Sequence, residues 1–170
     1  GYDPKYFKDV LLEILPNAKN YCLEPPYTVR GVCHWACIIG DLEIAKLLFQ
    51  TQKVLPNRVD SIGDTGPCSC ADNNYLSDEQ IINMIDFIIT QGYLINGNYN
   101  TVLECYTSSI MKRYSVVKYL LEKGANPYVE LQRKPSSSYL TLYESVMKSR
   151  DEKMKELFKT YGKTQVNDDI

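Results

Sequence analysis

The feature of this sequence that most constrains its fold is one helical pattern that occurs four times. In each copy the apolar side chains recur at helical spacing on one broad face, which is typical of an amphipathic helix packed on a neighbour. The copies span residues 42–49, 82–92, 115–126 and 153–162. Equivalent places in them are held by Leu47, Phe87, Tyr119 and Leu157. The separations between these residues fit a repeat of about 33 residues that carries inserted loops.

The residues around the first and third copies form a second, more specific pattern. Residues 34–48 are HWACIIGDLEIAKLL, residues 60–65 are DSIGDT and residues 120–127 are LLEKGANP. The first stretch resembles the signature of the ankyrin-repeat family, the second resembles the hairpin that opens a repeat, and the third resembles the end of a helix pair. The resemblance covers residues 27–162, and its divergent repeats and inserted loops resemble those of ankyrin proteins of large DNA viruses and of intracellular bacteria.

This resemblance implies an all-α fold, an ankyrin-repeat solenoid of about four helix-turn-helix repeats with short hairpin loops. Neighbouring repeats would stack, because one helix pair cannot bury its apolar face alone. The expected repeats are approximately 27–58, 59–95, 96–129 and 130–162. An amphipathic stretch that ends at Pro16 indicates an N-terminal capping helix within residues 1–26, and we expect residues 163–170 to be a flexible tail.

The sequence also departs from the family pattern. The usual Thr-Pro-Leu-His opening is intact nowhere, and only His34 keeps the imidazole that, in the family, ties the first helix to its hairpin. The second copy carries extra residues at 71–76, after which Ser77 and Gln80 form a capping box that starts a new helix. The fourth copy carries extra polar residues at 133–138.

Composition excludes several classes of protein. Apolar residues make up 44% and charged residues 24% of the chain, which is too apolar for a disordered protein. The formal net charge of −2 argues against a general nucleic-acid binder, and no apolar stretch is long enough to cross a membrane. The basic pairs Lys112-Arg113 and Arg133-Lys134 are expected on the solvated surface, with anchoring of an acidic partner as the alternative.

The six cysteines raise the question of metal or thiol chemistry. Cys33 and Cys37 are four residues apart on a predicted helix, and Cys68 and Cys70 lie in the equivalent region of the next repeat, but neither spacing is a zinc knuckle. We therefore expect buried free thiols rather than a zinc site, and a reducing compartment such as the cytosol. Cys22 and Cys105 have no evident partner.

No catalytic arrangement is evident either. Cys33 and His34 are adjacent on the predicted helix and so do not face each other, and phosphate-binding glycine loops are absent. We expect no catalytic residue, no metal, no cofactor and no small-molecule substrate.

The clearest candidate for a binding surface is apolar. Trp35 is the only tryptophan, and Ile38 and Ile39 occupy two places that ankyrin repeats usually fill with polar, groove-facing residues. An exposed aromatic anchor of this kind often dominates an interface; the alternative is that the N-terminal segment covers these side chains. The hairpin tips expected along the same concave side are Tyr27, Arg30, Ile62, Asp64, Asn98, Tyr99 and Asn100.

These observations predict a non-catalytic module that binds a partner protein through its concave face. One form of this expectation is a pathogen factor that engages or sequesters a host protein in the host cytosol. The alternative is a scaffold or substrate-recruiting part of a larger enzyme or ubiquitin-ligase adaptor, which the absence of an initial Met favours. A zinc-dependent or thiol enzyme is the third and least favoured hypothesis.

Overall fold

A computed structural model describes residues 9, 10, 13, 30–51, 54–97, 100–131 and 140–161 of the chain. These residues form seven α-helices and one short 3₁₀ helix. The helices are α2 (Val32–Ile39), α3 (Leu42–Thr51), η2 (Cys68–Cys70), α4 (Asp78–Thr90), α5 (Val102–Ser108), α6 (Tyr114–Glu122), α7 (Leu142–Lys148) and α8 (Glu152–Tyr161). Extended pairing within the described ranges consists of two isolated bridges, Val59 with Thr65 and Glu130 with Thr141. The prediction of an all-α fold is confirmed for the residues that the structure describes.

Several helices begin where a polar side chain caps the first turn. The Ser77 hydroxyl accepts a hydrogen bond from the Gln80 backbone N–H at 3.2 Å, and the Gln80 side chain accepts one from the Ser77 N–H at 2.9 Å. This reciprocal pair starts α4 and confirms the predicted capping box. Thr101 and Thr141 cap α5 and α7 by the same hydroxyl contact.

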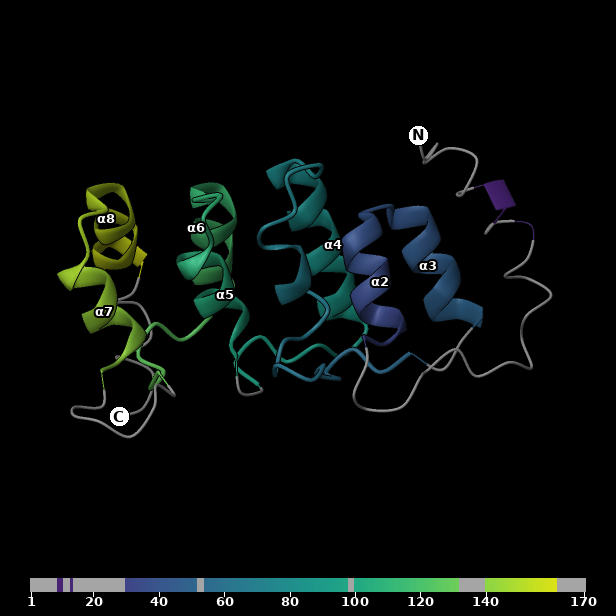
Figure 1. Cartoon of the computed structure of the whole chain (residues 1–170), viewed down its shortest axis with the longest axis horizontal. Helices are drawn as coiled ribbons and strands as arrows, with labels where there is room; N and C mark the ends of the chain where they lie inside the picture. The colour runs from purple at the N-terminus through teal and green to yellow at the C-terminus, as the bar shows by residue number, and fades with distance from the viewer. Residues whose placement is uncertain are drawn as a thin grey trace.

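The helices form two layers. In one layer α2, η2 and α5 contact one another in succession, and in the other α3, α4, α6 and α8 do so. The two layers are joined by the helix pairs α2–α3, α5–α6 and α7–α8. Figure 1 shows these pairs following one another along the long axis, from α2 and α3 at one end to α7 and α8 at the other. The helix pairs of the chain therefore form a row.

The apolar faces that the sequence pattern predicts point into the space between neighbouring pairs. The buried side chains of the second layer are Ile44, Ala45 and Leu48 on α3, Ile81, Met84, Ile85 and Ile88 on α4, Val116, Val117, Leu120 and Leu121 on α6, and Met154 and Phe158 on α8. Each set recurs at helical spacing, so a helix presents one apolar stripe to its neighbours. Phe49 and Phe87 add an edge-to-face ring contact between α3 and α4, with centroids 5.3 Å apart.

Two asparagines repeat one polar contact between successive pairs. The Asn57 side chain donates to the Gly92 carbonyl at 2.8 Å and accepts from the Leu94 N–H at 2.7 Å. Asn96 does the same one pair later, donating to the Gly124 carbonyl at 2.9 Å and accepting from the Asn126 N–H at 2.7 Å. Each amide thus satisfies one backbone donor and one backbone acceptor in the next turn, which fixes the spacing of the pairs.

The second pair differs from the others because its first helix is the short η2. The chain enters it through Gly66, where an added Cβ would lie 2.8 Å from the Cys33 carbonyl oxygen, so the backbone approaches α2 too closely for any other residue. After η2, the inserted residues 71–77 lead into α4.

Arg113 holds this inserted segment in place. Its guanidinium donates to the carbonyls of Ala71, at 3.2 Å, and Asn73, and forms an ion pair with Asp78 at 2.7 Å. Of the pair Lys112-Arg113, expected on the solvated surface, Lys112 is exposed, but the Arg113 side chain is buried, which corrects the expectation for Arg113. The planar guanidinium can reach three acceptors at once because its N–H groups point in fixed directions.

Some expectations lie outside the described residues. Of the predicted capping segment 1–26, only residues 9, 10 and 13 are described, and these are helical. The insertion at 133–138, with Arg133 and Lys134, and the tail 163–170 are also outside the described ranges. No helix in the described part of the chain combines the length and apolar character that crossing a membrane requires.

Replacing Arg113 with methionine tests the role of the buried guanidinium. We expect Arg113→Met to lower the free energy of unfolding by about 3 kcal/mol, because the Asn73 carbonyl and the Asp78 carboxylate lose the guanidinium donor and the Ala71 carbonyl loses one of its two donors. Urea denaturation followed by circular dichroism measures the change. Arg150→Met is the matched control, since Arg150 is exposed and its loss should change stability by less than about 0.5 kcal/mol. Equal effects of the two substitutions would contradict this role.

Candidate functional site

The candidate site begins at His34, which joins the first helix pair to the turn that follows it. The imidazole is fully buried at the start of α2, and its Nδ1 accepts a hydrogen bond from the Gly31 N–H at 3.1 Å. Because Nδ1 is an acceptor, Nε2 carries the proton and donates to the Asp64 carbonyl at 2.9 Å. The predicted role of His34 as the residue that ties helix to hairpin is confirmed.

Cys68 takes the corresponding position one pair later. It stands at the start of η2, and its sulfur lies 3.7 Å from the Asn100 carbonyl oxygen in the next turn. A thiol is a weaker donor than an imidazole N–H. The second pair therefore makes a contact equivalent to that of His34, but with a thiol as the weaker donor.

The turn at residues 59–65 is held from inside by one aspartate. Asp60 Oδ1 accepts hydrogen bonds from the N–H groups of Ile62, at 3.0 Å, and Asp64, at 3.1 Å, while Val59 and Thr65 pair across the base. The backbone groups of the tip are thus satisfied within the turn. As a result the Ile62 side chain projects outward and is 68% exposed.

Neighbouring segments brace this turn from both sides. Arg30 Nε lies 3.8 Å from Asp60 Oδ2. On the other side, Asn100 Nδ2 donates to the Ile62 carbonyl at 3.1 Å and to Asp64 Oδ1 at 2.8 Å. The structure therefore brings together four of the residues predicted from sequence, namely Arg30, Ile62, Asp64 and Asn100.

The three apolar residues predicted on α2 differ in their exposure to solvent. Trp35 is 53% exposed, whereas Ile38 and Ile39 are half-buried and Ile39 packs on the core. The inserted segment 71–77 reaches this end of α2, since Asn73 Nδ2 donates to the Ile38 carbonyl at 2.9 Å. This contact comes from the inserted segment and not from the N-terminal segment, which was the cover expected from the sequence.

The packing of Leu76 against Gly40 is a second, apolar contact between the inserted segment and the end of α2. Gly40 ends α2 with φ +69°, and a Cβ there would lie 2.2 Å from Leu76 Cδ2. Glycine is needed at this position both for the left-handed backbone and for the approach of Leu76. The remaining predicted residues, Tyr27, Asn98 and Tyr99, lie outside the described part of the chain.

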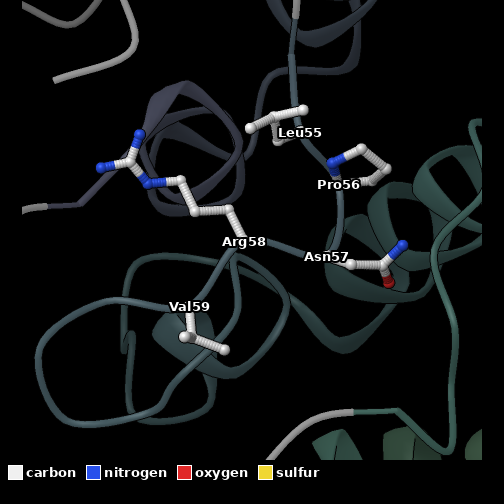
Figure 2. Close-up of a pocket in the computed structure, with 5 residues that line it drawn as sticks. All are labelled: Leu55, Pro56, Asn57, Arg58 and Val59. Carbon is white, nitrogen blue, oxygen red and sulfur yellow. The ribbon is translucent and has the colours of Figure 1, made fainter. Parts of the chain in front are cut away.

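A cavity of about 410 Å³ lies beside the segment that connects α3 to the turn at 59–65. Figure 2 shows its five lining residues, with the Arg58 and Asn57 side chains extending in different directions from this segment. Leu55, Pro56 and Val59 supply apolar walls. None of these five described lining residues is a nucleophile or a general acid or base.

The structure gathers cysteines from three helix pairs. Cys33 and Cys37 on α2 and Cys68 and Cys70 on η2 are buried free thiols, as predicted, and Cys105 on α5 is half-buried. Burial, followed by the neighbouring thiols of Cys33 and Cys70, raises the pKa of the Cys37 thiol. A thiol that holds its proton is a poor nucleophile, so this group does not suit covalent catalysis.

Cys105 was expected to have no partner, and the structure corrects this. Its sulfur is 3.8 Å from Asp64 Oδ1, and its donor atom, that of Cys68 and a carboxylate oxygen of Asp64 lie within 4.8 Å of one another. The sequence carries no local signal for this group, because Cys105 is one helix pair away from Asp64 and Cys68. Thiol and carboxylate are donors that a metal can use.

Comparisons of the chain with protein-family models, with curated proteins and with solved structures find no match.

The burial of Cys37 predicts slow alkylation in the folded chain. Iodoacetamide attacks the thiolate, and both enclosure and the raised pKa of Cys37 keep that form scarce. We expect the peptide that contains Cys37 to be modified more than about tenfold more slowly in buffer than in urea at the same pH. Mass spectrometry of the digested protein measures both rates, and equal rates would contradict the burial of this thiol.

Proposed function

We propose that this chain is a non-catalytic protein-interaction module of the ankyrin-repeat type. The resemblance of residues 27–162 to that family supports the proposal, as does the row of helix pairs in two layers. His34 adds further support, because its contact with the turn at 59–65 is the one that the resemblance implies. The inserted segment 71–77 and the short η2 are local departures that the row accommodates.

The partner protein binds on the side of the row that carries α2 and the hairpin turns. The observation that carries this assignment is the exposure of two large apolar side chains, Trp35 on α2 and Ile62 at the tip of the next turn. Exposed aromatic and aliphatic anchors on braced backbone are typical of interface hot spots, since little entropy is lost when they bind. The bracing by Arg30 and Asn100 keeps Ile62 in place before the partner arrives.

The setting of this interaction is a reducing compartment such as the cytosol. Five cysteines of the described chain are free, and four of them are buried. Free thiols persist where glutathione keeps them reduced. From the resemblance to viral and bacterial ankyrin proteins, we propose that the partner is a host protein that this module engages or sequesters.

Affinity capture from a eukaryotic cytosolic lysate, followed by binding of the purified partner, tests the proposal. We expect the double variant Trp35→Ala/Ile62→Asp to lose at least about thirtyfold in affinity, which is the effect of removing one strong hot spot. Circular dichroism and thermal unfolding establish that the variant is folded.

Tyr75→Ala is the matched control, because Tyr75 is 90% exposed but lies in the inserted segment 71–77 rather than on α2 or a hairpin tip. This variant should bind the partner as tightly as the unmodified chain. Equal affinity of the folded double variant would place the interface elsewhere and contradict the proposal. Capture of no partner would favour the alternative function, a scaffold or substrate-recruiting part of a larger enzyme or ubiquitin-ligase adaptor.

A further inference from the structure

Two cysteines and one aspartate converge where the second and third helix pairs meet. Asp64 lies in the turn at 59–65, Cys68 begins η2 and Cys105 lies on α5. One donor atom from each residue lies within 4.8 Å of the other two. We propose that Asp64, Cys68 and Cys105 bind a zinc ion, through one carboxylate oxygen and two thiolates. Asp64 belongs to the turn that carries Ile62, but zinc binding by this group requires neither the partner protein nor an enzymatic activity.

The spacing of the donors suits zinc. A tetrahedral site with Zn–S bonds of about 2.3 Å and Zn–O bonds of about 2.1 Å separates neighbouring donor atoms by about 3.6–3.8 Å. Cys105 Sγ and Asp64 Oδ1 are already 3.8 Å apart. The remaining separations, all within 4.8 Å, reach this range with side-chain shifts of about 1 Å. The backbone of the turn and both helices can therefore stay in place.

Hydrogen bonds from a second layer of residues hold two of these ligands in place. The Thr65 hydroxyl donates to Cys68 Sγ at 3.4 Å, and its oxygen is 3.0 Å from the Tyr93 hydroxyl, so the tyrosine can donate to the threonine in turn. Asn100 Nδ2 donates to Asp64 Oδ1 at 2.8 Å. Such outer contacts orient metal ligands and stabilise their charge.

The donor types select the metal. Thiolates favour zinc and other soft or borderline cations over magnesium and calcium, which prefer oxygen ligands. Asp64 and Cys105 are only half-buried, so solvent reaches the group and water completes the four ligands. The ion would link the turn of the second pair to the first helix of the third pair.

Zinc binds cysteine as the thiolate, so its uptake by this group displaces the thiol protons.

The test uses the full chain, reduced and freed of metal, in equilibrium dialysis against Zn²⁺ with elemental analysis. We expect one zinc per chain, and cobalt substitution should give thiolate-to-metal charge-transfer absorption. Cys105→Ser should abolish that zinc uptake, and Asp64→Asn should weaken it at least about tenfold. Cys105→Ser is a conservative change at a half-buried position, and circular dichroism checks that it is folded.

Cys33→Ala is the matched control, because Cys33 is a buried thiol of α2 outside the proposed ligand set. This variant should keep one zinc per chain. Absence of zinc uptake by the unmodified chain at micromolar Zn²⁺ would overturn the proposal. Full uptake by folded Cys105→Ser, or loss of zinc from folded Cys33→Ala, would overturn the assignment to these three residues.

Discussion

The structure depends on the burial of one apolar helix face between two neighbouring helix pairs. The helix α4 shows this most clearly, since it packs between α3 and α6 and its Ile81, Ile85 and Ile88 are fully buried. A single pair of short helices would leave its apolar face exposed to water, so each pair is stable only beside the next. The row of pairs follows from this requirement, and so does the presence of turns along one side of it.

Polar side chains set the register of the row where apolar packing alone would allow sliding. His34 and Cys68 reach the backbone of the following turn from the first layer, while Asn57 and Asn96 do so near the ends of the second-layer helices. These contacts satisfy turn backbone that would otherwise need water. The turn side chains are then free to face outward, which links the construction of the row to the exposure of Ile62.

The features that the sequence predicts correctly depend on short stretches of the chain. The helical stripes of α3, α4, α6 and α8, the capping box at Ser77 and the role of His34 depend on residues close in sequence or on a family pattern. The burial of Arg113, the hydrogen bond from Asn73 to the Ile38 carbonyl and the contact of Cys105 with Asp64 depend on which loops lie side by side. Inserted segments such as 71–77 determine those contacts, and the spacing of residues in the sequence does not predict where such a segment packs.

Each of the first two helix pairs is tied to the next through side chains that reach the neighbouring turn. His34 is the only histidine of the chain, so the ¹⁵N resonances of its ring can be assigned without ambiguity. Long-range ¹H–¹⁵N correlation spectra of the folded protein report which nitrogen carries the proton. We expect one fixed tautomer, with the proton on Nε2, and slow exchange of that proton with water, because the ring is fully buried and Nε2 donates to the Asp64 carbonyl. A protonated Nδ1, or an averaged and rapidly exchanging ring, would contradict this expectation.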